Sequence, residues 1–335
     1  MRLYDSIGFL DFPRIAQRKT PFNFIIGGRG TGKTYGALKY ACEYYAQTGR
    51  KFILMRRTQT QLDKISNAAF NPFKSINDYF MKSIIKNVYG IYAPGDEQPA
   101  GYAVALSTIS SLRGFDASDV DIIVYDEFIG EKHDRPIKAE NDALLNAYET
   151  VNRNRELSGA DPVKMFCLAN SNDLANPVFI GLELVSVAEK MKRTGFEFYE
   201  DNKRGVSLYL LNNCPISEKK KETALYKMSA DSEFFDMAIN NDFAADETAR
   251  VKPQDLKQFK LICSVGEISI YKHKAENRYY ITPATRGSAK EYKTSDMDLR
   301  RFRREKYFLW LAYLHNVITF ASYTQKVLFE KYFAI

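Results

Sequence analysis

Residues 27–34 read Gly27-Gly28-Arg29-Gly30-Thr31-Gly32-Lys33-Thr34. They fit the phosphate-loop pattern G-x-x-x-x-G-K-[ST]. An apolar, branched segment at 22–26 precedes them and indicates a buried parallel strand, and residues 34–47 carry apolar side chains at helical spacing. Because glycine has no Cβ atom, consecutive backbone N–H groups can point at phosphates, and the helix N-terminus adds its positive dipole end. The eight residues together predict a nucleoside triphosphate site.

The last two residues of this loop have separate chemical roles. In the pattern the lysine, here Lys33, reaches the β- and γ-phosphates, and the hydroxyl of Thr34 ligates Mg²⁺. With Gly at about 7% of residues, a chance match in a chain this long has a probability of about one per cent. A glycine turn that binds nothing is the alternative interpretation. We therefore expect ATP and Mg²⁺ as ligands.

A second acidic motif follows about 90 residues later. Residues 122–125 are Ile, Ile, Val and Tyr, and Asp126 and Glu127 come directly after them. Four apolar residues followed by Asp-Glu form the Walker B pattern, which is weak alone but strong at this distance behind a P-loop. We expect Asp126 to hold the Mg²⁺ and Glu127 to polarise the attacking water.

Another apolar segment, residues 163–169, ends in Asn170. In P-loop ATPases with a catalytic glutamate, a strand lies between the P-loop strand and the Walker B strand, and a polar residue at its tip can contact the γ-phosphate or the attacking water. Asn170 is the candidate sensor. The alternative is a cap for the helix entered through Asn176 and Pro177.

Several arginines have more than one interpretation. Arg56 and Arg57 directly follow a predicted strand at 51–55. The end of that strand lies on the ligand side of an open α/β sheet. The two arginines therefore either contact nucleotide or DNA or form salt bridges. Arg113, Arg153 and Arg155 have no obvious role within their own subunit. An arginine presented to the γ-phosphate of a neighbouring subunit would stabilise the transition state, but each of the three could equally be an ordinary surface ion pair.

Charge is distributed unevenly along the 335 residues. From residue 257 onward there are 15 Lys and Arg against 7 Asp and Glu, a net charge of +8, so the rest of the chain is near −1. A basic last quarter suggests a polyanion partner, although a solvated surface without a partner is also open. The four cysteines are far apart and we expect them to be reduced, in the cytosol. We expect no signal peptide and no membrane span.

The chain divides into three predicted segments. Residues 1–205 are expected to form an α/β P-loop NTPase domain of the ASCE or RecA-like class with a parallel sheet, including a helix at 71–81. Residues 206–255 are expected to be a linker domain. Residues 256–335 predict antiparallel strands followed by helices, with arginines at a helix start that could contact a phosphate backbone.

Six stretches together resemble the genome-packaging ATPases of φ29-like small tailed phages, over nearly the whole chain. They are Phe24-Ile25-Ile26-Gly27-Gly28-Arg29-Gly30, Met55-Arg56-Arg57 with Leu62, Tyr125-Asp126-Glu127-Phe128-Ile129, Ala143-Leu144-Leu145-Asn146, Thr150-Val151-Asn152-Arg153-Asn154-Arg155-Glu156 and Cys167-Leu168-Ala169-Asn170. The resemblance implies a homomeric, pentameric ring docked on the portal of an empty procapsid. There, in the host cell cytoplasm, ATP hydrolysis would drive double-stranded DNA inward.

The resemblance also implies roles for particular residues. The arginine that matches Arg153 acts in trans as an arginine finger, with Arg113 as the competing position. The last domain, residues 256–335, would resemble an RNase H fold that has lost its metal-binding carboxylates. Some relatives use a packaging RNA. A terminase-type packaging ATPase with an active metal-dependent nuclease, and a nucleotide switch that does not hydrolyse, are the alternative functions.

Overall fold

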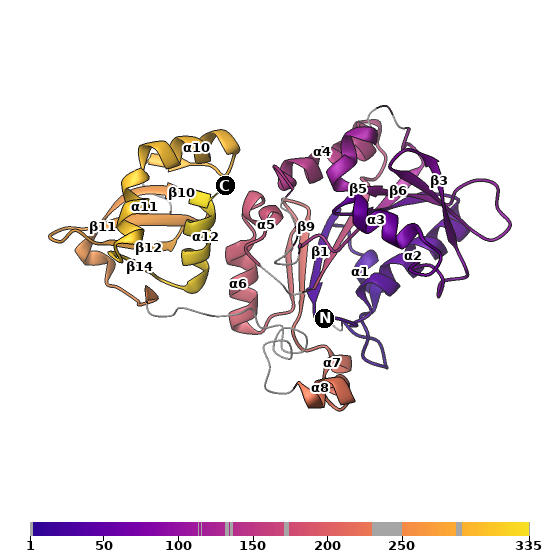
Figure 1. Ribbon diagram of the computed structural model, residues 1–335, viewed down its shortest axis with the longest axis horizontal. Coiled ribbons are helices and arrows are strands. Elements are labelled where there is room, and N and C mark those ends of the chain that lie inside the picture. Colours follow the sequence, from indigo (N-terminus) through magenta and orange to yellow (C-terminus); the bar gives the residue numbers. More distant parts are fainter. Residues whose placement is uncertain are drawn as a thin grey trace. The chain divides into compact units, whose positions relative to one another are not determined.

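The apolar segments that precede the predicted site residues all form strands of one sheet in the computed structural model (Figure 1). The structure describes residues 3–112, 114, 116–130, 134, 137–170, 174–229, 250–285 and 290–334, without the side chains of 110–112. Two compact units are present. One comprises Met1–Asn172 and Met191–Phe243, and the other comprises Asp173–Lys190 and Ala244–Ile335.

The first unit contains the large sheet, with the strand order β3-β4-β5-β2-β6-β7-β1-β9-β8 among the described residues. The six strands from β5 to β9 in that order run parallel, and antiparallel strands flank them at both edges. The strands are β1 (Phe22–Gly27), β2 (Lys51–Arg56), β3 (Phe80–Ile85), β4 (Val88–Tyr92), β5 (Gly101–Ala105), β6 (Val120–Asp126), β7 (Lys164–Ala169), β8 (Phe198–Asp201) and β9 (Val206–Leu211).

The first unit also contains six helices among its described residues. They are α1 (Phe12–Ala16), α2 (Lys33–Thr48), α3 (Gln59–Ser66), α4 (Glu140–Asn152), α7 (Pro215–Lys221) and α8 (Ala224–Met228), with 3-10 turns at Leu106–Leu112 and Arg155–Ser158. The P-loop strand β1 and the Walker B strand β6 have β7 between them. The predicted parallel α/β arrangement, with a strand inserted at this position, is therefore confirmed.

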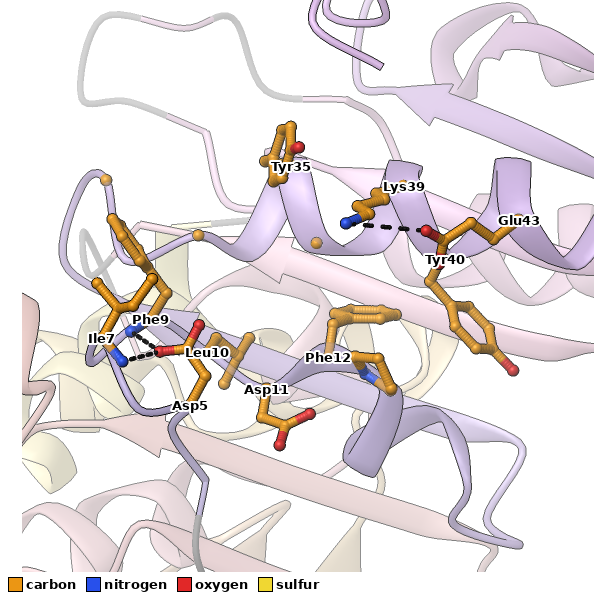
Figure 2. Close-up of a pocket in the computed structure, with 14 residues that line it drawn as sticks. Asp5, Ile7, Phe9, Leu10, Asp11, Phe12, Tyr35, Lys39, Tyr40 and Glu43 are labelled. Carbon is orange, nitrogen blue, oxygen red and sulfur yellow. Dashed lines mark hydrogen bonds and ion pairs between the residues drawn. The ribbon is translucent and has the colours of Figure 1, made fainter. Parts of the chain in front are cut away.

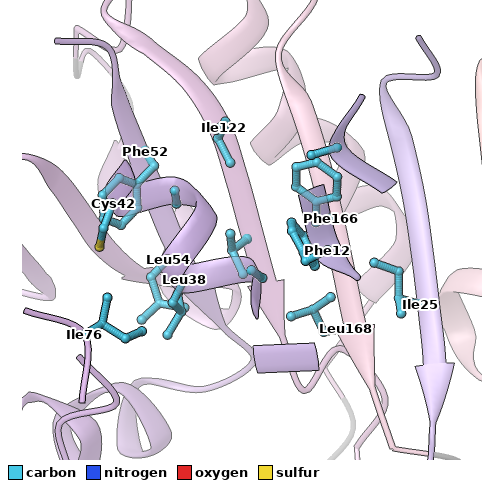
Figure 3. Close-up of a cluster of buried hydrophobic side chains, with 14 of the residues drawn as sticks. Phe12, Ile25, Leu38, Cys42, Phe52, Leu54, Ile76, Ile122, Phe166 and Leu168 are labelled. Carbon is cyan, nitrogen blue, oxygen red and sulfur yellow. The ribbon is translucent and has the colours of Figure 1, made fainter. Parts of the chain in front are cut away.

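The main hydrophobic core lies between one face of this sheet and helices α1 and α2. Figure 3 shows Phe12 of α1 beside Phe166 of β7, and their ring centroids are 4.9 Å apart. Leu38 of α2 and Leu54 of β2 belong to the same cluster. On the other face, Tyr148 of α4 packs against a ring of β1 at a centroid distance of 4.5 Å. Because both faces are covered by helices, the central strands are buried along nearly their whole length and are mostly apolar, as is usual for parallel strands.

Two predictions about this unit differ from the structure. The predicted boundary at 205 falls inside the sheet, because β9 is fully buried and pairs with β1 from Phe22–Val206 to Gly27–Leu211. No helix forms at 71–81. Asn77 and Asp78 both take the left-handed conformation, at φ 51° and 54°, and β3 begins two residues later. Asn and Asp adopt this conformation more easily than other non-glycine residues, so the helical spacing of the apolar side chains is interrupted there.

The second unit is a small α+β domain, as predicted. Its sheet has the order β13-β10-β11-β12-β14, with β10, β11 and β12 antiparallel and the two edge strands parallel to their neighbours. The elements are α5 (Pro177–Gly181), α6 (Val185–Thr194) up to Lys190, η5 (Leu256–Gln258), β10 (Phe259–Val265), β11 (Ile268–His273), β12 (Tyr279–Pro283), β13 (Lys290–Tyr292), α10 (Asp296–Glu305), α11 (Tyr307–Leu314), β14 (Ile318–Phe320) and α12 (Tyr323–Ala334). The relation of this unit to the RNase H fold stays a prediction.

A segment that the sequence assigns to the motor domain belongs to this second unit. Glu267, in the turn between β10 and β11, accepts hydrogen bonds from the backbone N–H groups of Val185 (3.1 Å) and Ser186 (2.7 Å) at the start of α6. Ser322 donates to Glu189 at 2.6 Å. These bonds attach 173–190 to the C-terminal strands and helices, so the unit is assembled from two separate parts of the sequence.

The arginines of this unit lie later in their helix than the sequence suggests. The helix α10 begins at Asp296, with Ser295 as its N-cap, and carries Asp296 and Asp298 in its first turn. Arg303 and Arg304 lie in its last turn. Acidic side chains at the N-terminus and basic ones at the C-terminus both stabilise a helix through its dipole, so the charges of α10 favour this helix.

Candidate active site

The P-loop connects β1 to α2 through glycines in unusual conformations. Gly30 and Gly32 have φ values of 69° and 91°, which favour glycine. The Thr31 hydroxyl donates to the Gly28 carbonyl oxygen at 3.1 Å and closes the loop on itself. The helix α2 begins at Lys33 directly behind it. The residues predicted to bind phosphate, Gly27 to Thr34, thus form one turn at the carboxyl end of β1.

Lys33 is buried inside this loop. Its Nζ donates to the carbonyl oxygens of Gly27 (2.8 Å) and Gly28 (2.9 Å). Burial lowers the pKa of Lys33 to about 8, and the nearby Asp126 carboxylate partly opposes that shift. A phosphate bound in the loop would favour the charged ammonium in the same way, since opposite charges at close range stabilise each other.

Thr34 and Asp126 lie side by side, as a Mg²⁺ site requires. The Thr34 hydroxyl donates to Asp126 Oδ1 at 2.9 Å, and the Asp126 side chain is buried. Burial raises the pKa of Asp126, while the guanidinium of Arg56 acts in the opposite direction. Mg²⁺ prefers oxygen ligands, keeps several waters and needs only one or two protein groups beside the substrate phosphates. A hydroxyl and a carboxylate oxygen at this separation fit that ion.

Arg56, the last residue of β2, holds both acidic residues of the Walker B motif. Its guanidinium lies 2.9 Å from Asp126 Oδ2 and 2.6 Å from Glu127 Oε2. Glu127 is half exposed and has φ 57°, a conformation that non-glycine residues rarely adopt. Of the two interpretations of Arg56, the salt bridge is the one that the structure contains. Arg57 is likewise paired, with two bonds to the buried Glu140 at 2.7 and 3.0 Å.

Asn170 is close to the P-loop. It follows β7, and its Oδ1 accepts a hydrogen bond from Lys33 Nζ at 3.4 Å. The alternative role as a helix cap is filled by another residue, because Asn176 itself accepts the bond from the N–H of Phe179 in α5. The structure therefore brings together Lys33, Thr34, Asp126, Glu127 and Asn170 at the carboxyl ends of β1, β6 and β7.

Two of the three arginines proposed to act in trans lie at the opposite edge of the sheet. Asn152, at the end of α4, accepts a bond from the N–H of Val163 just before β7, so Arg153 is near the amino ends of the parallel strands. A strand of six residues is about 20 Å long, which separates Arg153 from its own P-loop. Arg155 is largely buried against Asp121 at 3.0 Å. Arg113 lies outside the described residues.

A cavity that the sequence does not indicate adjoins the P-loop. It has a volume of about 620 Å³ and lies between the N-terminal loop at 5–13 and the helix α2 (Figure 2). The Asp5 carboxylate orders this loop by accepting bonds from the N–H groups of Ile7, Gly8 and Phe9. Tyr35, on the first turn of α2, lines the cavity together with Gly30 and Gly32. The sequence of this segment gives no local signal for a cavity, since Pro13 lies in the first turn of α1, where proline is tolerated.

The described part of the chain contains neither a metal-binding cluster of side chains nor a membrane-spanning helix. No three His, Cys, Asp or Glu side chains there lie close enough to hold a metal ion together. No helix there has the length and apolar character needed to cross a membrane.

The family model described as podovirus DNA encapsidation protein (Gp16) matches residues 6–303 of this sequence. The chain belongs to that family. A DNA packaging protein of Bacillus phage PZA is 30% identical over 78% of this chain and 72% of its own length. That of Bacillus phage phi29 is 29% identical over the same shares. The resemblance inferred from the sequence is confirmed.

Two solved structures have the same fold over nearly their whole length. The bacteriophage Phi-29 genome packaging motor assembly matches with a TM-score of 0.64 at 22% identity, covering 97% of this chain and 98% of that one. The Phi-28 gp11 DNA packaging motor matches with a TM-score of 0.62 at 18% identity, covering 98% of both chains. At these identities the match establishes the fold.

Proposed function

We propose that this chain is a packaging ATPase, which hydrolyses ATP with Mg²⁺ and drives double-stranded viral DNA into a procapsid. The observation that carries the proposal is the convergence of Lys33, Thr34, Asp126, Glu127 and Asn170 at one edge of the sheet. A phosphate-binding loop alone would support nucleotide binding. An acidic pair and a polar sensor beside the same loop are what hydrolysis needs in addition.

Each residue has a role in this mechanism. The P-loop N–H groups and Lys33 bind and orient the phosphates, and Thr34 and Asp126 would hold the Mg²⁺. When bound, that ion supplies positive charge that neutralises the phosphate oxygens. Glu127 accepts a proton from the attacking water, and Asn170 orients the water or the γ-phosphate.

Glu127 can act as a base only after it leaves Arg56. In the structure the guanidinium of Arg56 holds Glu127 Oε2 at 2.6 Å. While Oε2 accepts this bond, it is not available to accept a proton from the attacking water. We infer that nucleotide binding releases Glu127, which would couple the start of hydrolysis to an occupied site.

The cavity beside the P-loop is suited to the base of the nucleotide. Tyr35 and Phe9 offer aromatic surface there, and the side chains of Asp11 and Lys39 offer polar groups (Figure 2). Ligand pockets commonly combine apolar walls with a few polar groups in a volume of about 300–1,000 Å³. The position next to Gly30 and Gly32 supports this assignment.

We further propose that the active site is completed by a second copy of the chain in a ring. Arg153 is exposed at the far edge of the sheet from its own P-loop, so it could reach a γ-phosphate only in a neighbouring subunit. Arg155 supports the fold through Asp121 and is less suited to that role. By resemblance to the family, the ring is pentameric and acts at the portal vertex within the host cytoplasm, with a packaging RNA in some relatives.

The basic second unit is the proposed contact for DNA. Its helix α10 carries Arg300, Arg301, Arg303 and Arg304 on two turns. Contacts between arginines and phosphates release counterions, so the logarithm of the DNA affinity should fall linearly with the logarithm of salt concentration. We expect Arg300→Gln with Arg304→Gln to reduce that slope by about two. An unchanged slope would place the DNA contact elsewhere.

Phosphate release by the purified full-length chain tests the ATPase proposal. The rate should be measured against protein concentration, with and without double-stranded DNA, for wild type and for Lys33→Ala. We expect the rate per subunit to rise as the protein assembles, and Lys33→Ala to abolish it. A wild-type chain that releases no phosphate at any concentration would refute the proposal, and a rate independent of concentration would refute the shared site.

A further inference from the structure

A lysine from α7 lies on the P-loop and has no role in the mechanism above. Lys220 Nζ donates a hydrogen bond to the carbonyl oxygen of Arg29, the third residue of the loop. The approach is close, because a Cβ atom built on Gly30 would collide with Lys220 Nζ. Gly30 therefore lacks a side chain at the point where the lysine crosses the loop.

The helix α7 is fixed in this position by the N-terminal loop. Lys219 Nζ donates to the carbonyl oxygen of Ile7 at 2.8 Å, and the thiol of Cys214 donates to that of Gly8 at 3.4 Å. The same loop is bonded to the P-loop, since the N–H of Leu10 donates to the carbonyl oxygen of Thr31 at 3.0 Å. Lys220 is thus presented to the P-loop by a connected set of bonds and not by one flexible side chain.

No carboxylate of the described chain neutralises the positive charge of Lys220, so this charge can bind an anion. In the described part of the chain, no carboxylate lies within salt-bridge distance of Lys220, whereas its neighbour Lys221 is paired with Glu218 at 2.8 Å. Lys220 is half buried, and that burial lowers its pKa. Lys33 lies near enough for the two ammonium groups to repel each other. The ammonium groups of Lys33 and Lys220 both approach the loop, and Lys220 has no carboxylate partner among the described residues. A phosphate bound between these two groups would stabilise both charges.

We propose that Lys220 is a second phosphate-binding lysine of the nucleotide site, delivered by α7. When the triphosphate of ATP lies in the P-loop, the Lys220 ammonium contacts a phosphate oxygen in addition to, or in place of, the Arg29 carbonyl. The inference rests on the proposed function, because it needs a nucleotide in the loop. The proposed contact between Lys220 and phosphate would hold α7 more firmly on the P-loop with nucleotide bound than without it.

Binding of a fluorescent ATP analogue to the full-length chain tests this assignment. The variants are Lys220→Met, which keeps the aliphatic stem, Lys220→Arg, which keeps the charge, and Lys221→Met as a matched control on the same helix. We expect Lys220→Met to weaken binding about tenfold, as the loss of one charge-assisted hydrogen bond does. Lys220→Arg should restore most of the affinity, and Lys221→Met should bind like wild type.

A second measurement separates phosphate contact from packing. In wild type, ATP should slow amide hydrogen exchange in a peptide covering residues 215–221, and in Lys220→Met it should not. If Lys220→Met binds ATP as tightly as wild type, the inference is wrong while the proposed function stands. Equal loss in Lys220→Met and Lys220→Arg would also overturn it. A wild-type chain that does not bind the analogue at all would overturn both.

Discussion

Arg56 contacts both carboxylates of the Walker B motif, so one side chain influences the metal ligand and the proposed base together. Burial raises the pKa of Asp126, and its bond to Arg56 offsets only part of that shift. The bond of Arg56 to Glu127 holds a residue that already has a strained backbone at φ 57°. Strain of this kind persists only where surrounding contacts fix it. We infer that nucleotide binding must break the bond between Arg56 and Glu127 before Glu127 can act as the base.

The first prediction concerns Glu127. Glu127→Gln keeps an oxygen that can accept the bond from Arg56, so the fold and ATP binding should be preserved, but the amide cannot take a proton from water. We expect the hydrolysis rate to fall by about 10²- to 10⁴-fold, the usual contribution of a general base. Phosphate release under saturating ATP measures this. Equal rates for wild type and variant would remove Glu127 from the role of base.

The second prediction concerns the buried ion pair of Arg57 and Glu140, whose side chains are 4% and 1% exposed. Arg57→Met would leave the Glu140 carboxylate without its partner, and breaking such a pair costs about 3–5 kcal/mol. Replacing both residues with apolar ones, by Arg57→Met together with Glu140→Leu, should recover most of that loss. The double variant should therefore unfold at a higher urea concentration than Arg57→Met alone. Circular dichroism during urea unfolding measures both, and equal midpoints would contradict the argument.

Among the helices and strands, the sequence predicts best those whose position is set by hydrophobic periodicity and by a local motif. The strands before the P-loop, Asp126 and Asn170 are short, branched and apolar, and all form with the expected neighbours. The helix expected at 71–81 fails because the conformations of Asn77 and Asp78 override its spacing. Long-range partners such as Glu267 with α6, or Lys220 with Arg29, have no local signal. They depend on segments that meet only in the folded chain.

The third prediction concerns Glu267 and the start of α6. Its buried carboxylate accepts the N–H groups of Val185 and Ser186, so Glu267→Ala leaves one buried and one partly buried donor without this partner. We expect the second unit to lose about 1–3 kcal/mol, and Glu267→Gln to lose less because its amide oxygen can accept one bond. Trp310 is the single tryptophan of the chain and lies in α11 of this unit, so its fluorescence during urea unfolding reports the effect.

The same carboxylate gives a pH dependence with a definite sign. Burial raises the pKa of Glu267 above its usual value of 4.5, so the folded state holds the proton more tightly than the unfolded state. The proton-linked part of the stability that Glu267 contributes is therefore complete below pH 4.5 and is lost as the pH rises through the raised pKa. The difference in unfolding free energy between wild type and Glu267→Gln should fall as the pH rises from 4.5 through the raised pKa. A difference that rises with pH would show that the pKa is lowered instead.

At the scale of the whole molecule, the parallel sheet places the two halves of the proposed active site at opposite edges. The P-loop and the Walker B acids follow the carboxyl ends of the strands, whereas Arg153 follows α4, which returns to the amino ends. Both groups are present in every copy of the chain, but no single copy can bring them together. ATP hydrolysis would thus depend on assembly and would occur only at the interface between two subunits of the ring.

The fourth prediction uses mixed rings to test this arrangement. Arg153→Ala subunits should bind ATP but hydrolyse it slowly, because each site lacks the neighbour's guanidinium. Glu127→Gln subunits supply Arg153 but cannot hydrolyse ATP themselves. When the two inactive variants are mixed, an Arg153→Ala site beside a Glu127→Gln subunit has every group it needs, so the phosphate-release rate should exceed that of either variant alone. Arg155→Ala serves as the comparison, because its loss acts through the fold at Asp121 and should not be rescued in this way. Rescue of Arg113→Ala with none of Arg153→Ala would assign the finger to Arg113.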